Sequence, residues 1–269
     1  MTIQLLPSDF DDEAAAAIRL FWSGRVLADT KAEGSQGGTR DGVISGKNMD
    51  GFIDLVRYVA THCGLAGGEV YTNKGSVVLP GYFRATKNWD VLVVHKRRLI
   101  AVFEFKSQVG SFGNNFNNRS EEVIGAAADL WVAHHHGAYT DARGGGGHEP
   151  WLVHDADPLI NPKIQHDPRP PFLAWLMLLE ECAASLTPVS VSEPHFKVLP
   201  EFEGASYARR YQILCERLVE RQLYGSAALV LSPRERGAAR CAHRSLSEAT
   251  SLRALFTEFA SRVAAATSA

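Results

Sequence analysis

Two runs of β-branched and aromatic residues, 89–95 and 99–106, flank the basic segment Lys96-Arg97-Arg98. Such runs on either side of a short polar turn are typical of a β-hairpin. This hairpin is the strongest constraint that the sequence places on the fold. A polar loop at 107–118 follows it. A helix of about four turns is then predicted at 121–136, with Asn118 and Glu121 spaced as a capping pair.

The rest of the chain alternates between helical and strand-like segments. Helical periodicity indicates helices at 9–25, 49–63, 205–224 and 246–265. Strand-like runs lie at 70–72, 77–79, 172–179 and 227–231. Stretches rich in glycine or proline predict long loops at 31–46 and 137–171. This order predicts an α/β fold in which helices flank a mixed central sheet.

The composition excludes several classes of protein. Lys plus Arg is 28 and Asp plus Glu is 30, so the net charge of −2 excludes a uniformly basic coat but not a local basic face. None of the four cysteines forms a CxxC pair, which argues against a zinc site and for a reducing compartment. The N-terminal residues contain no apolar signal-peptide core, and the longest apolar run, 172–179, is too short to cross a bilayer. We expect a soluble, cytoplasmic protein without a membrane partner.

The hairpin brings two carboxylates together. If the turn has three residues, His95 pairs with Leu99, and counting outward sets Asp90 opposite Glu104. Opposed side chains on neighbouring strands have Cβ atoms about 5 Å apart, so two carboxylates there repel each other unless a cation lies between them. A two-residue turn would break this register.

Oxygen ligands on a rigid sheet suit Mg²⁺. Alternation along a strand places Lys106 on the same face as Glu104. A lysine ammonium beside a metal ion can orient an attacking water and stabilise the charge that develops on phosphorus. The residues therefore predict a metal-dependent phosphodiesterase site.

The same residues carry a resemblance to a known family. Asp90 with Glu104-Phe105-Lys106 resembles the PD-(D/E)xK nuclease signature, with Trp89 in place of the usual proline. The distinctive segment 112–119, Phe-Gly-Asn-Asn-Phe-Asn-Asn-Arg, is similar to the XhoI family of type II restriction endonucleases. So are the segments 88–94, 104–110, 193–196 and 206–215, and the resemblance runs from about residue 46 to residue 231.

The resemblance implies a restriction-endonuclease-like core and a Mg²⁺-dependent homodimer that cuts both strands of a DNA palindrome. By similarity the palindrome is CTCGAG, cut after the first C to leave 5′-phosphate ends and a 5′ overhang. Asp90 and Glu104 would be the metal ligands and Lys106 the catalytic lysine. A DNA methyltransferase is expected in the same restriction-modification system, without direct contact. We expect one domain over residues 1–269, with a catalytic core at about 46–180 and a DNA-contacting, helical part at about 195–269.

Further residues are candidates for DNA contact. Asn can bond adenine and Arg can bond guanine in pairs, and the candidates are Gln108, Asn114, Asn115, Asn117, Asn118, Arg119, Arg209 and Arg210. An asparagine-rich turn and surface salt bridges are the competing interpretations. Asp50 and Glu121 are candidates for an additional acid in the site. A solvated helix face is the preferred interpretation of the first, and a favourable helix-dipole position is the preferred interpretation of the second.

Two alternative functions remain open from the sequence. One is a repair or recombination nuclease that selects DNA structure rather than sequence. The other is a non-catalytic DNA-binding module in which the carboxylates are structural. Discrete cleavage fragments would distinguish sequence-specific cutting from the first alternative. Binding without cleavage in Mg²⁺ would favour the second.

Overall fold

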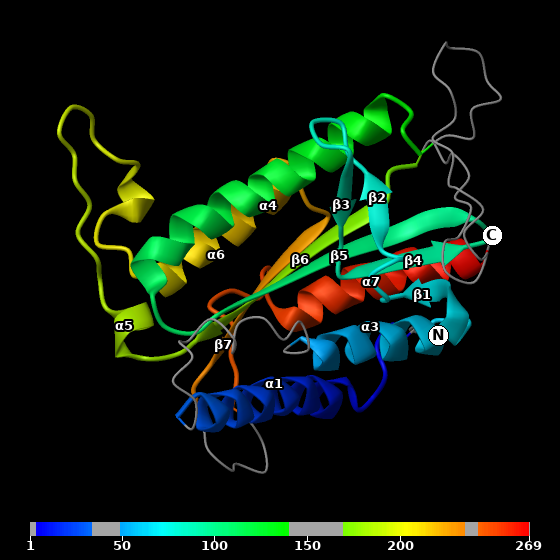
Figure 1. The fold of residues 1–269 in the computed structure, drawn as a ribbon, viewed down its shortest axis with the longest axis horizontal. Helices are drawn as coiled ribbons and strands as arrows, with labels where there is room; N and C mark the ends of the chain where they lie inside the picture. The colour runs from blue at the N-terminus through cyan, green and yellow to red at the C-terminus, as the bar shows by residue number, and fades with distance from the viewer. Residues whose placement is uncertain (1–3, 34–48, 140–168, 235–241, 269) are drawn as a thin grey trace.

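The computed structural model of the chain describes residues 4–33, 49–139, 169–234 and 242–268. Most of the two predicted long loops lies outside these residues. Helices α1 (Phe10–Glu33), α3 (Asp50–His62) and α7 (Leu252–Thr267) lie on one side of a central sheet, and α4 (Phe112–His135) and α6 (Tyr207–Glu220) lie on the other (Figure 1). The short helical segments are η1 (Gly67–Glu69), α5 (Ala183–Leu186) and η2 (Pro200–Phe202). In the described part of the chain, no helix is long and apolar enough to cross a membrane.

The central sheet has five strands in the order β1-β4-β5-β6-β7. Its strands are β1 (Val70–Tyr71), β4 (Val91–His95), β5 (Arg98–Gln108), β6 (Phe172–Glu180) and β7 (Ser226–Ser232). Pairing is antiparallel from β1 to β5 and parallel from β5 to β7. The predicted α/β fold with a mixed sheet flanked by helices is therefore confirmed.

A second, two-stranded sheet pairs β2 (Val78–Pro80) with β3 (Thr86–Asn88), and Leu79 lies opposite Lys87. The two predicted strands near residues 70 and 78 both exist, but they belong to different sheets. Since β3 ends just before Asp90, the small sheet lies against the start of β4 (Figure 1).

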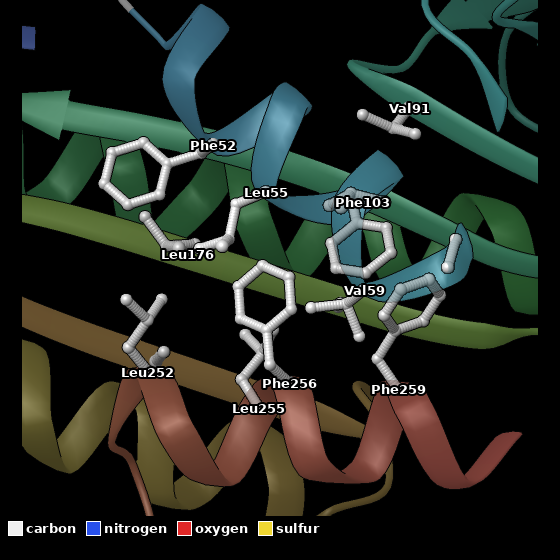
Figure 2. Packing of buried hydrophobic residues seen from close by; sticks show 14 of the residues in the cluster. Phe52, Leu55, Val59, Val91, Phe103, Leu176, Leu252, Leu255, Phe256 and Phe259 are labelled. Carbon is white, nitrogen blue, oxygen red and sulfur yellow. The ribbon is translucent and has the colours of Figure 1, made fainter. Parts of the chain in front are cut away.

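Alternation along the strands divides the hydrophobic core into two clusters, one on each face of the sheet. Phe103 packs between α3 and α7, with its ring centroid 4.9 Å from that of Phe259 and near Val59 (Figure 2). The even-numbered residue Val102 and its β6 partner Leu173 belong to the cluster under α4 and α6. Glu104 and Lys106 share the parity of Val102 and therefore lie on the α4 and α6 face.

The hairpin turn differs from the prediction. His95 pairs with Arg98, so the turn has two residues, Lys96 and Arg97, whose φ angles of 47° and 66° match a tight hairpin turn. Further along, Val94 pairs with Leu99 but Val93 pairs with Ala101, which leaves Ile100 as a bulge. The extra residue restores the register that the shorter turn would have broken.

The helix after the hairpin is longer than predicted. It begins at Phe112 instead of 121, so the predicted loop 107–118 is largely helix and the proposed Asn118–Glu121 capping pair lies inside it. The physical reason is aromatic packing: Phe116 contacts Tyr211 of α6 at 5.0 Å between ring centroids, and Phe112 stacks on Tyr207 at 6.1 Å. These tertiary contacts outweigh the weak helix propensity of glycine and asparagine.

Candidate active site

Asp90 and Glu104 face each other across β4 and β5. Val91 pairs with Phe103, and the next position along places Asp90 opposite Glu104. The Asp90 amide donates to the Phe103 carbonyl at 3.1 Å, and the Phe105 amide donates to Asp90 Oδ2 at 2.6 Å. The backbone of β5 thus fixes the Asp90 carboxylate beside Glu104.

Glu104 is the centre of a cluster of charged side chains. Its side chain is only 2% exposed, and its Oε1 atom accepts from two lysines: Lys87 Nζ at 2.9 Å and Lys106 Nζ at 3.0 Å. Burying a carboxylate is costly unless it is paired. Two ammonium groups on one oxygen satisfy this requirement for the Glu104 charge.

Lys106 also reaches α4 on the far side of the cluster. Its Nζ atom lies 2.9 Å from Glu122 Oε1, and Glu122 Oε2 lies 2.6 Å from Arg119. Burial opposes the charge of Lys106, but the carboxylates of Glu104 and Glu122 outweigh burial and raise the pKa of Lys106. Burial likewise opposes the charge of Glu122, yet its bonds to Lys106 and Arg119 lower its pKa. Lys106 is therefore held in its charged form.

The surroundings of Asp90 disfavour its charged form, whereas those of Lys106 and Glu122 favour theirs. Burial is the main cause of its raised pKa, and the nearby charge of Glu104 adds to the effect. The Phe105 amide, Lys106 and Lys87 act against the rise without cancelling it. The surroundings of Asp90 therefore disfavour its charged form, chiefly because the carboxyl group is buried.

Two buried atoms at the site make no hydrogen bond to any residue that the structure describes. They are Glu104 Oε2 and Trp175 Nε1, and these residues are lateral neighbours in the β5–β6 register. The Tyr224 hydroxyl lies nearby and donates to the Val123 carbonyl. Burial, the charges of Glu104 and Glu122, and the closeness of the Tyr224 hydroxyl to the Glu104 side chain raise the pKa of Tyr224 well above its usual range.

These observations test whether the residues fit a divalent cation. Glu104 offers a buried carboxylate oxygen without a geometric hydrogen bond to the described residues, and Asp90 is a neighbouring carboxylate whose pKa is raised by burial. Hard oxygen atoms of this kind suit Mg²⁺. Within the described ranges, the site brings together two such acids and not a cluster of three or more metal-ligating side chains. The pair fits an ion that takes its remaining ligands from water and phosphate.

The predicted asparagine contacts lie on α4 instead of in a loop. Asn114, Asn117 and Asn118 are exposed, and Asn115 is half-buried. Arg119 is half-buried and its guanidinium is paired with Glu122, so it contributes to the charged cluster. The helix therefore presents three of these four asparagines to solvent, on the turns that precede Arg119 and Glu122.

Three of the other predicted DNA contacts are engaged within the protein to different degrees. Gln108 is buried, with its amide bonded to Gly110 and Ser111 carbonyls and to the Tyr211 hydroxyl. Arg210 donates to the backbone carbonyls of Ala205 and Val189. Arg209 is exposed, and its nearest acid, Glu216, is 3.9 Å away. Of the three, Arg209 is the one placed to meet an external phosphate.

The structure does not bring the two predicted additional acids to the site. Asp50 lies on α3, which packs on the opposite face of the sheet from Glu104. Glu121 is exposed on α4. Its neighbour Glu122 is the acid that contacts Lys106.

Sequence reasoning missed two members of the cluster. Lys87 stands three residues before Asp90 on β3. Because β3 belongs to the two-stranded sheet, side-chain alternation along the central strands does not show that Lys87 lies beside Glu104. Glu121 and Glu122 together begin the helix that the sequence predicts, where either is interpreted as a favourable helix-start charge or as an additional metal ligand. The contact of Glu122 with Lys106 is not foreseen, because the predicted helix begins too late. A helix beginning at Phe112 would have placed Arg119 and Glu122 one turn apart on the same face.

Comparison with known proteins shows the family to which the chain belongs. The family model described as "Restriction endonuclease XhoI" matches residues 28–157 and 159–243. The chain is 42% identical over 215 residues to the type II restriction enzyme XhoI of Xanthomonas vasicola, covering 79% of this chain and 76% of that protein. It is 41% identical over 213 residues to the type II restriction enzyme BstVI of Geobacillus stearothermophilus, covering 77% and 83%.

A third relative is the type II restriction enzyme AbrI of Azospirillum brasilense, 40% identical over 195 residues, covering 71% of this chain and 75% of that protein. No solved structure matches significantly. The family match covers β4, β5 and α4, which carry the charged cluster, and continues to the segment after β7. The chain therefore belongs to the XhoI family of restriction endonucleases and is a type II restriction endonuclease.

Proposed function

We propose that the protein hydrolyses double-stranded DNA at a specific palindrome in a Mg²⁺-dependent reaction. The resemblance to the XhoI family implies the site CTCGAG, cut after the first C to leave 5′-phosphate ends and a 5′ overhang. The observation that supports the chemistry is the joint position of Asp90, Glu104 and Lys106 on one sheet face, with one Glu104 oxygen buried and unpaired.

In the proposed reaction Asp90 and Glu104 hold Mg²⁺. When bound, the ion supplies positive charge that polarises the phosphodiester. Water attacks phosphorus and loses one proton to the solvent, the bond from phosphorus to O3′ breaks, and O3′ takes up a proton from the solvent, so the products are a 5′-phosphate and a 3′-hydroxyl. Lys106 donates hydrogen bonds to the attacking water or to the non-bridging oxygens, where negative charge grows in the transition state. Its contact with Glu122 keeps the ammonium aimed from the α4 side.

A palindromic target is two-fold symmetric, so we propose a homodimer in which each subunit cuts one strand. The exposed asparagines of α4, together with Arg209, are the proposed DNA contacts. A methyltransferase that protects the same sequence is the expected companion enzyme. We also propose that the whole chain acts as a single domain, because β7 and α7 pack into the same central sheet as the catalytic hairpin.

Digestion of a sequenced phage DNA tests this proposal. The wild-type protein is incubated with Mg²⁺ beside three controls: EDTA, Lys106→Ala, and Lys74→Ala, which removes an exposed lysine away from the cluster. We expect discrete fragments with TCGA overhangs for wild type and Lys74→Ala. We expect at least a 100-fold loss of cleavage rate in the other two.

Other outcomes separate the alternatives. Discrete ends at another sequence would retain the mechanism and reject CTCGAG. A continuous smear of fragments would favour a structure-selective nuclease. Intact DNA, under conditions where a gel shift shows binding, would favour the non-catalytic module.

A further inference from the structure

Lys87 and Lys106 donate to the same oxygen atom of Glu104. Lys106 belongs to β5, as Glu104 does, but Lys87 comes from β3 of the separate two-stranded sheet. One ammonium group would be enough to pair a single carboxylate. The second lysine therefore calls for an explanation of its own.

The environment of Lys87 holds its ammonium at the edge of the site. Its side chain is 12% exposed, and the ammonium lies 4.4 Å from the centre of the Trp89 ring, a favourable cation–π distance. Trp89 and Asp90 follow Lys87 on the same short segment. The flexible four-carbon stem allows the ammonium to move by a few ångström without a change in the backbone.

The charges in the cluster balance without a metal ion. The cations are Lys87, Lys106 and Arg119, and the anions are Asp90, Glu104 and Glu122. A divalent cation at Asp90 and Glu104 would leave two positive charges in excess and would repel the nearest ammonium groups. DNA phosphates are the anions that can compensate for this excess.

We propose that Lys87 is a second active-site lysine, which occupies Glu104 in the free protein in competition with the divalent cation and contacts a DNA phosphate once the cation is bound. This inference rests on the proposed function. The competing explanation is that Lys87 only fastens β3 to β5. That explanation predicts weaker folding on removal of the lysine and no gain in affinity for a cation.

The test uses Lys87→Met, which keeps the unbranched stem and removes the charge, and Lys87→Arg, which keeps the charge. Lys74→Met is the matched control on an exposed lysine. Ca²⁺ binding to the DNA-free protein is measured by titration calorimetry, since Ca²⁺ takes the same oxygen ligands. Cleavage is measured as the single-turnover rate at saturating Mg²⁺, and thermal melts report folding.

We expect Lys87→Met to bind Ca²⁺ about tenfold more tightly, because a repelling charge a few ångström away has been removed. We expect its cleavage rate to fall roughly 100-fold, because a contact to the phosphate has been lost. Lys74→Met should stay within about threefold of wild type in cleavage rate. Lys87→Arg, which keeps the charge, should lose less cleavage rate than Lys87→Met and should show no gain in Ca²⁺ affinity. If Lys87→Met does not fold, Lys87→Gln replaces it in the same measurements.

Unchanged or weaker Ca²⁺ binding by the folded charge-removing variant would overturn the inference, and so would an unchanged cleavage rate. Failure of the proposed function has a different signature: the wild-type protein itself would not cut DNA in Mg²⁺. A competing ammonium predicts that Lys87→Met binds Ca²⁺ more tightly and cuts DNA more slowly. A merely structural ion pair predicts that Ca²⁺ affinity and cleavage rate both fall or that both stay unchanged.

Discussion

The carboxylate of Asp90 is held firmly in place, but its surroundings disfavour its negative charge. It is fixed by a hydrogen bond from the Phe105 amide, and its burial beside Glu104 raises its pKa. A buried carboxylate of this kind opposes folding whenever it is ionised. The residue is thus positioned for a ligand at some cost in stability, as is common at functional sites.

Replacing Asp90 by Asn should therefore stabilise the protein in EDTA while abolishing cleavage. Because the pKa of Asp90 is raised in the folded state, its charge destabilises the fold as pH rises above the ordinary value of 3.8. At neutral pH we expect a melting temperature higher by a few degrees, corresponding to about 1 kcal/mol. The gain should vanish near pH 3, where the carboxyl is protonated in both states.

Thermal unfolding of Asp90→Asn from pH 3 to 8 measures this effect, with Asp54→Asn as the control. Asp54 is 68% exposed and forms a surface ion pair with Arg57, 3.1 Å away on the same helix. A variant less stable than wild type at neutral pH would show that the Asp90 charge supports the fold. That result would also weaken its assignment as a metal ligand.

At the scale of elements, the turn that joins β2 and β3 is held by one buried acid of α4. Asp129 accepts from the amides of Tyr82 and Phe83 at 2.8 and 2.7 Å and from Arg84 at 2.7 Å. Gly81 permits this approach, because a Cβ there would lie 2.4 Å from Asp129 Oδ2. The same turn leads into β3 and so determines where Lys87 lies.

Asp129→Asn should loosen this turn and reduce cleavage through Lys87. Loss of charged hydrogen bonds should lower the free energy of unfolding by about 1–2 kcal/mol. Hydrogen exchange should speed up at the Tyr82 and Phe83 amides, while the amides of β6 stay protected. Unchanged exchange at those two amides would show that the turn does not depend on Asp129.

The elements also show what the sequence could predict. The hairpin, the helix at 49–63, and the strands near 172 and 227 follow from residue periodicity, which is local information. The start of α4 does not, because it depends on Phe112 and Phe116 packing against α6, far along the chain. The sequence places Asp90 opposite Glu104 on the assumption of a three-residue turn, whereas the turn has two residues. The register is the same because the bulge at Ile100 adds the missing residue. Lys87 was missed because its strand joins the site from another sheet.

At the scale of the whole molecule, the two faces of the central sheet differ in the side chains that they carry. The face toward α1, α3 and α7 is a hydrophobic core that contains Phe103 and Phe259. The face toward α4 and α6 carries the charged cluster at one end of its own core. Both faces thus contribute a hydrophobic core to the fold, and the face toward α4 and α6 also carries the charged cluster that is proposed to meet DNA.

If each subunit cuts one strand, a dimer with one inactive subunit should nick its target. Wild-type and Lys106→Ala chains with different affinity tags are co-expressed, and the mixed dimer is purified through both tags. With a supercoiled plasmid that carries one site, the mixed dimer should produce open circles, whereas the wild-type dimer produces linear DNA. Linear product from the mixed dimer at the wild-type rate would contradict the one-strand-per-subunit arrangement.

The bulge at Ile100 has a further consequence for protein engineering. It separates the geometry of the turn at Lys96 and Arg97 from the pairing of Asp90 with Glu104, because a change in length can be absorbed between the two. The turn lies six residues from Asp90, which is about 20 Å along an extended strand. It is therefore a suitable place to graft a fluorescent reporter or a surface anchor, leaving the cutting machinery undisturbed.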